Sequence, residues 1–113
     1  MRKELNRLIY CTFLVTVSVL VFSFFWENNL LITSVIILIS IVLLFIFREK
    51  DNLYVFITMA IIGPLVEICD IYFGAWQYSN PNLYLIPTWL PFVWGEFGIF
   101  GNALIKFLDS MKK

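Results

Sequence analysis

Two carboxylic acids lie close together in the otherwise apolar stretch from residue 53 to residue 73. Gly63, Glu67, Asp70 and Gly74 follow one another at spacings i, i+4, i+7 and i+11, which place all four on one face of a helix. Small residues on that face allow a second helix to approach closely. Acids in an apolar helix are costly to expose to lipid and commonly mark a functional site.

A third acid, Glu96, lies in the last apolar stretch of the chain. Pro91, Gly95, Gly98 and Asn102 repeat the same i, i+4, i+7, i+11 spacing around it. Glu96 is about 100° around the helix from Gly95, so it need not face the 53–73 stretch. We therefore expect two small-residue faces to pack against each other, through Gly63, Gly74, Gly95, Gly98 and Asn102.

The three acids have no Lys or Arg at their expected depth to neutralise them. Burial and mutual repulsion favour the protonated form of at least one of them, and a neutral carboxyl group in an apolar pocket is a potential general acid. Glu67, Asp70 and Glu96 are therefore predicted catalytic residues. The alternative is that they serve only as hydrogen-bonding links between helices, which is the role we expect for Asn102.

The connection at residues 74–88 is uncharged, aromatic and interrupted twice by proline. Its aromatic residues, and those that open the next stretch, are too dense to be explained only by a preference for the membrane surface. Irregular backbone at membrane depth persists where it is buried or lines a cavity. We therefore predict an outer aromatic cap or substrate pocket that includes Trp76, Tyr78, Trp89 and Trp94.

This part of the chain has a recognisable pattern: Glu67-x-x-Asp70-x-x-x-Gly74-x-Trp76-x-Tyr78, then Pro87, Pro91 and Glu96-Phe97. Over Gly63–Asn102 it resembles the small membrane proteins of carotenoid biosynthesis, which include heterodimeric lycopene cyclase subunits and carotenoid hydratases. Such cyclases usually carry two adjacent acids after the proline, where this chain has one.

The resemblance implies a hydrophobic, isoprenoid-like lipid substrate. In a cyclase of that kind, a neutral carboxylic acid protonates a polyene, aromatic faces shelter the carbocation, and a carboxylate removes a proton. The acids and aromatic residues named above are of the types that this chemistry requires. Neither the resemblance nor the residues predict a cofactor.

Four apolar segments must position these residues, at about 8–26, 30–47, 53–73 and 89–108. Each is close to the roughly 20 residues that a membrane-spanning helix needs. The chain is 61% hydrophobic and 14% charged, well outside the range of soluble domains. Since backbone in lipid must be helical, we predict a single all-α domain, a polytopic bundle of four transmembrane helices.

The basic residues predict the orientation of this bundle. With four spans, all eight Lys and Arg residues fall on one side, which the positive-inside rule makes cytoplasmic. We therefore expect a multi-pass protein of the cell membrane with both termini inside. The first segment lacks a small-x-small cleavage pattern, so we expect it to be retained rather than removed as a signal peptide.

The amino-acid composition also excludes several classes of function. The chain has no His, and its equal numbers of basic and acidic residues give no reason to expect nucleic acid as a partner. Two Cys make no disulfide framework, and no metal motif is present. Three classes remain: an acid-catalysing enzyme or enzyme subunit for an isoprenoid lipid, a small transporter or proton-relay component, and a non-catalytic assembly protein. Four short helices enclose little volume, so we expect a homo- or hetero-oligomer.

Overall fold

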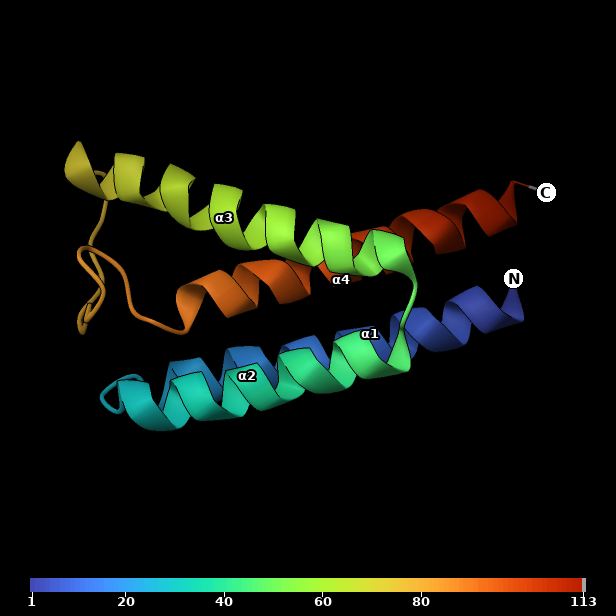
Figure 1. The fold of residues 1–113 in the computed structure, drawn as a ribbon, viewed down its shortest axis with the longest axis horizontal. Helices are drawn as coiled ribbons and strands as arrows, with labels where there is room; N and C mark the ends of the chain where they lie inside the picture. Colours follow the sequence, from blue (N-terminus) through green and yellow to red (C-terminus); the bar gives the residue numbers. More distant parts are fainter. Residues whose placement is uncertain (113) are drawn as a thin grey trace.

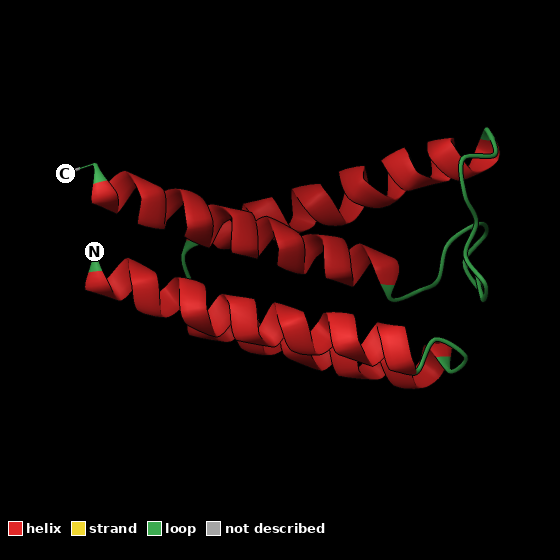
Figure 2. Cartoon of the chain, turned by 180° about the vertical axis from the view of Figure 1, so that it is seen from behind, coloured by secondary structure: helices red, strands yellow, loops and turns green. Residues whose placement is uncertain are grey.

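The computed structural model describes residues 1–112, and these form four helices (Figure 1). The helices are α1 (Arg2–Phe24), α2 (Asn29–Ile46), α3 (Lys50–Tyr72) and α4 (Leu90–Met111). No strand occurs in this part of the chain, apart from an isolated bridge between Leu83 and Ile86 in the long loop (Figure 2). The predicted all-α class is confirmed. Each predicted apolar segment overlaps one helix, and α1 begins at Arg2, before the predicted start at residue 8.

Three of the helices are long and apolar enough to cross a membrane: α1, α2 and α3. Among residues 1–112, α4 does not join them. The four spans predicted from the sequence are thus matched for three helices. α4 carries Glu96, Asn102, Lys106 and Asp109, and it contacts all three other helices, so most of its sides meet protein. A helix in that position has less need of an apolar surface.

The helix ends follow local chemistry. The side chain of Asn28 accepts a hydrogen bond from the backbone N–H of Leu31 and caps α2. A proline, Pro91, lies in the first turn of α4, where its missing N–H costs nothing. Beyond α3, Gly74 adopts φ +89°, a left-handed conformation that favours glycine.

Gly74 corrects one prediction made from spacing. It was expected on the packing face of the 53–73 helix, but the helix has already ended at Tyr72. No atom lies within 4 Å of the position that a Cβ of Gly74 would occupy. Its backbone N–H donates to the carbonyl of Ile71, so the residue belongs to the turn that ends α3, because the i+11 position falls past the last helical residue.

α3 and α4 make the most extensive contact between any two helices. A Cβ built on Gly63 would lie 2.1 Å from the indole of Trp94, and one built on Gly95 would lie 2.5 Å from the ring of Phe56. At Gly98 the nearest side-chain atom, on Val55, is 2.8 Å from the same position. These three glycines are thus sites where the aromatic and aliphatic side chains of the neighbouring helix occupy the space of a side chain.

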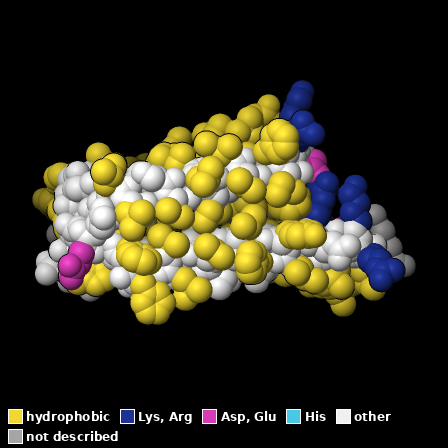
Figure 3. Space-filling model, turned by 90° about the horizontal axis from the view of Figure 1, so that it is seen from below, with side chains coloured by type: hydrophobic (Ala, Val, Ile, Leu, Met, Phe, Trp, Pro, Cys, Tyr) yellow, Lys and Arg dark blue, Asp and Glu magenta, His cyan; other side chains and the backbone are white. Residues whose placement is uncertain are grey.

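Hydrophobic side chains cover much of the outer surface, and Figure 3 shows one such face. Lys and Arg side chains gather at one end of it. This is the end at which both termini and the α2–α3 turn meet in Figure 1. An apolar belt with basic residues confined to one end is typical of membrane-spanning bundles.

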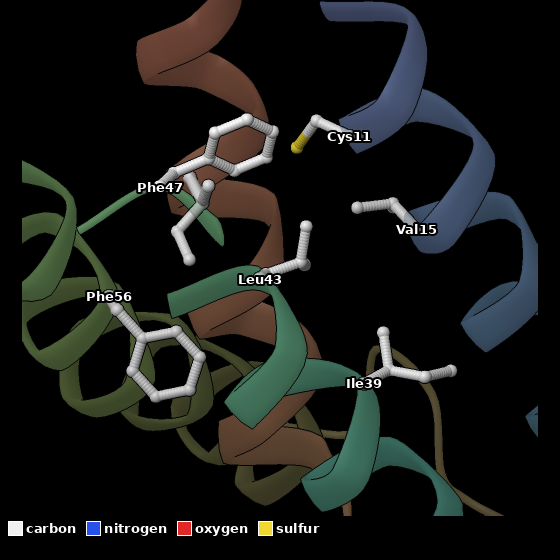
Figure 4. Packing of buried hydrophobic residues seen from close by; sticks show 7 residues of the cluster. Cys11, Val15, Ile39, Leu43, Phe47 and Phe56 are labelled. Carbon is white, nitrogen blue, oxygen red and sulfur yellow. The ribbon is translucent and has the colours of Figure 1, made fainter. Parts of the chain in front are cut away.

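The interior contains two clusters of buried apolar side chains. One lies toward the termini and joins all four helices; Figure 4 shows six of its residues labelled. Its members are Cys11, Val15, Ile39, Leu43, Phe47, Phe56 and Ile99. The other lies near the long loop and consists of Ile32, Ile36, Ile86, Trp89, Leu90 and Val93. The second cluster packs the loop against α2 and the first turn of α4.

Candidate functional site

Glu67 is half-buried, and both oxygens of its carboxyl group accept hydrogen bonds. The hydroxyl of Tyr78 donates to Oε1, and the indole N–H of Trp94 donates to Oε2. Tyr78 belongs to the loop after α3, and Trp94 belongs to the second turn of α4. One acid therefore connects α3, the aromatic loop and α4.

Tyr78 connects this acid with two hollows in the surface. One has a volume of about 360 Å³ and is lined by Tyr78, Ile71, Trp76 and Leu85 together with other loop residues. The other, of about 160 Å³, lies between Tyr78 and residues of the α1–α2 turn. Burial raises the pKa of the Tyr78 phenol above its ordinary value, and the hydrogen bond to Glu67 raises it further. Tyr78 is therefore a neutral donor at physiological pH.

The four predicted pocket aromatics do not line one pocket. Trp76 and Tyr78 share the larger hollow. Trp89 lines the smaller hollow together with Tyr78 but is largely buried: its ring stacks on Phe22 at 4.6 Å, and its N–H donates to Asn29 Oδ1 at 3.2 Å. Trp94 packs over Gly63 and binds Glu67. The aromatic density seen in the sequence thus divides between a cavity wall and core packing.

Glu96 occupies a separate and fully enclosed site. The hydroxyl of Ser18 in α1 donates to one carboxyl oxygen at 2.6 Å, and that of Ser40 in α2 donates to the other at 2.9 Å. Glu96 follows Trp94 by two positions, so it points roughly 200° around α4 from the side chain that binds Glu67. The side chain joins α4 to α1 and α2.

The three acids expected to form one catalytic group are therefore not brought together. Glu67 and Glu96 have different partners on different sides of α4. Asp70 is half-buried, and its carboxylate makes no hydrogen bond or ion pair within residues 1–112. No three His, Cys, Asp or Glu residues of this range lie where they could share a metal ion.

Sequence reasoning missed Ser18 and Ser40, which hold Glu96. Both are hydroxyl residues with apolar residues on either side in the sequence. An acid on a neighbouring helix needs such hydrogen-bond donors when it is buried. The helix faces expected for Ser18 and Ser40 could have been compared with the face expected for Glu96. Without knowing which helices are neighbours, however, the pattern does not single them out from other serines and threonines of the same helices.

A second missed group holds the aromatic loop in place. The side chain of Asn29 donates to the carbonyl of Asn80 at 2.7 Å, and Asn80 in turn donates to the carbonyls of Trp26 and Glu27. The hydroxyls of Thr33 and Thr88 lie 2.8 Å apart. These contacts tie the loop to the turn between α1 and α2, which gives the wall containing Tyr78 a defined position.

Asn102 lies far from these sites, near the termini. Its amide donates to Asn52 Oδ1 at 2.8 Å and to Asp51 Oδ2 at 3.3 Å, while Lys106 pairs with the same Asp51 oxygen at 2.8 Å. These contacts link α4 to the first turn of α3. Asn102 thus makes the interhelical hydrogen bonds that its place in the small-residue face suggests.

Comparisons of the chain with protein-family models, curated proteins and solved structures found no match. The fold and its sites define a small all-α protein with three helices suited to crossing a membrane, two separately held acids and an aromatic loop. Its function must be inferred from these features alone.

Proposed function

We propose that the chain is a multi-pass membrane enzyme, or a subunit of one, that performs acid–base chemistry on an apolar isoprenoid-like lipid. One observation carries the proposal: the hydroxyl of Tyr78 touches Glu67, and the same side chain lines the 360 Å³ hollow beside the aromatic loop. Pockets of roughly 300–1,000 Å³ with mostly apolar walls and a few polar groups are typical of small-molecule sites.

The proposed step is a proton relay through Tyr78. In this step Glu67 is protonated on Oε1 and its hydrogen bond with Tyr78 is reversed, so that Glu67 donates its proton to the Tyr78 oxygen while Tyr78 donates its own proton to a double bond of the lipid. Glu67 is then ionised, Tyr78 is unchanged, and the lipid is a carbocation beside the aromatic wall that includes Trp76. Loss of a proton from a neighbouring carbon, back through Tyr78 to Glu67, gives an isomerised or cyclised product and restores the acid.

The test is lipid analysis of cells that contain polyene precursors and express the chain or a variant. We expect a new cyclised or isomerised product by chromatography and mass spectrometry. Glu67→Gln and Tyr78→Phe should each abolish it. Glu96→Gln is the matched control, because Glu96 lies on another side of α4, and it should retain the product. Equal products from Glu67→Gln and the parent would refute the relay.

A non-catalytic assembly role is the second candidate, and one observation favours it. Both oxygens of Glu67 and both of Glu96 are occupied by donors from other segments of the chain, as expected of acids that hold helices together. In that case Tyr78→Phe should lower stability while no lipid product depends on the chain. The same set of variants therefore separates the two candidates.

We also propose that α4 crosses the membrane with the other three helices and that both termini are cytoplasmic in the cell membrane. The confinement of the described basic residues to one end supports this orientation. Single cysteines at Glu27 and Ser79, in a Cys69→Ala background, should label from outside the cell. A cysteine at Lys50 should label only after the membrane is opened. Labelling of Glu27→Cys from the cytoplasm alone would contradict the orientation.

A further inference from the structure

A further cavity lies at the opposite end of the bundle from Tyr78. It has a volume of about 400 Å³ and opens where the first turns of α1, the last turns of α4 and the α2–α3 turn meet. This size falls within the roughly 300–1,000 Å³ of small-molecule pockets. The proposed lipid chemistry makes no use of it, so it stands independently of that proposal.

The walls of this cavity carry charges of both signs in equal number. The basic groups are Lys3 and Arg7 from α1 and Lys106 from α4, and the acidic groups are Glu4, Glu49 and Asp109. Its apolar lining comes from Phe47, Ile99 and Ala103. A cavity lined by charged groups of both signs and by apolar side chains suits an amphiphilic ligand whose headgroup carries one positive and one negative charge.

Several of these charges are held in position by partners. Arg7 pairs with Glu49 and lies over the ring of Phe47, while Lys106 pairs with Asp51. The carboxylate of Glu4 pairs with the N-terminal ammonium group at 2.9 Å. Lys3, by contrast, makes no ion pair within residues 1–112. Lys3 and Arg7 are four residues apart and share a helix face, which directs both toward one ligand group. An anionic phosphate is the group that such a pair of cations binds best.

The acids indicate what accompanies the phosphate. Asp109 contacts Lys112 at 3.8 Å, and both side chains are well exposed, so this pair is weak and its carboxylate is available. A primary ammonium group needs such acceptors, whereas a quaternary ammonium group is recognised by cages of aromatic faces. Phe47 is the one aromatic ring in the described lining, and Arg7 already covers it.

The position of the cavity indicates the source of this ligand. It lies at the end of three helices that are long and apolar enough to cross a membrane, where phospholipid headgroups lie. We propose that the cavity binds a phospholipid with a phosphoethanolamine headgroup, with the phosphate at Lys3, Arg7 and Lys106 and the ammonium at Asp109.

Native mass spectrometry of the full chain in a neutral detergent tests this proposal. The protein is equilibrated with equal amounts of phosphatidylethanolamine, phosphatidylcholine and phosphatidylglycerol that share the same acyl chains. We expect phosphatidylethanolamine to be retained about tenfold better than either competitor, the ratio that one charge-assisted hydrogen bond supplies. Equal retention of all three lipids, or preference for the anionic one, would overturn it.

Two variants and one control locate the site. Lys3→Gln and Asp109→Asn should each reduce the retention of phosphatidylethanolamine by about tenfold, since each removes one charged partner. Lys50→Gln removes the same charge from an exposed position at the same end but outside the cavity, and retention should be unchanged. Equal losses in Lys3→Gln and Lys50→Gln would show general attraction by surface charge and refute the site.

A competition experiment with soluble phosphoethanolamine distinguishes a lipid from a soluble phosphate ester. If the ligand is a lipid, its chains add contacts, and an equal concentration of the soluble compound should not displace it. Displacement at equal concentration would assign the cavity to a soluble phosphate ester and overturn the lipid assignment.

Discussion

Glu67 and Glu96 are the same residue type on neighbouring helices, yet their surroundings differ in kind. Glu96 is fully enclosed and is held by two serine hydroxyls from rigid helices. Glu67 is half-buried and is held by two aromatic side chains, one of them on a loop and at the wall of a hollow. The difference lies in access: a ligand could approach the partner of Glu67, while Glu96 meets only protein.

The two environments suit different roles: that of Glu96 suits a structural role, and that of Glu67 suits a chemical one. A buried acid on one helix whose donors come from two other helices contributes mainly to the choice of one packing arrangement. An acid at the edge of a hollow, coupled to a group that can exchange protons, has the geometry that catalysis requires. If the two acids differ in this way, substitutions at Glu96 should mainly affect stability, and substitutions around Glu67 should mainly affect its site.

Glu96→Ala should be the most destabilising single change considered. It leaves the hydroxyls of Ser18 and Ser40 without their acceptor and opens a cavity, and we expect a loss of about 3 kcal/mol in the free energy of unfolding. Glu96→Gln keeps the shape and one acceptor oxygen, so the loss should be about 1 kcal/mol. Unfolding in mixed micelles measures both. A loss from Glu96→Ala no greater than that from Asp70→Ala would contradict the comparison.

Gly63→Ala should disturb the site of Glu67 while leaving that of Glu96 intact. The added Cβ would lie 2.1 Å from the indole of Trp94, so the ring must move away from Glu67. Overpacking of this kind costs about 2 kcal/mol. Gly101→Ala is the matched control, because no atom lies within 4 Å of its Cβ position. Tryptophan fluorescence and unfolding should both change for Gly63→Ala, and an unchanged spectrum would count against the proposed packing.

Tyr78→Phe removes one donor to Glu67 and keeps the aromatic ring. We expect a loss of about 1 kcal/mol in the free energy of unfolding, because Glu67 retains its bond from Trp94. The effect should be smaller than that of Glu96→Ala and should largely disappear when Glu67→Gln is already present. A double-mutant cycle measures this coupling. Fully additive losses would show that the two side chains do not interact.

The pH dependence of stability should be the smallest effect. Burial raises the pKa of Tyr78 in the folded protein. The stabilisation from this phenol is therefore fully present below the ordinary tyrosine pKa of about 10. That contribution is lost as the pH rises from there toward the higher folded pKa. The free energy of unfolding should therefore fall above about pH 10 in the parent and fall less in Tyr78→Phe. Parallel curves would contradict the burial of this phenol.

The sequence alone determined the helices and their approximate limits. Apolar runs such as 30–47 leave the backbone no partner in lipid except itself, so helix follows from composition. The glycine spacing around Gly98 also indicated which faces would come close, because the 3.6-residue period is a local property. Gly74 was assigned to the packing face from its i+11 spacing alone, although the apolar pattern already ended at residue 73, one residue after the observed helix end at Tyr72.

Only the tertiary structure decided what each acid does. Whether Glu96 meets Ser18 and Ser40 or the partners of Glu67 depends on the rotation of α4 relative to three other helices. Residues 78 and 67 meet only because the loop is tied to the α1–α2 turn by Asn29 and Asn80. Such contacts join segments that are far apart in the chain, and hydrophobic periodicity carries no information about which segments become neighbours.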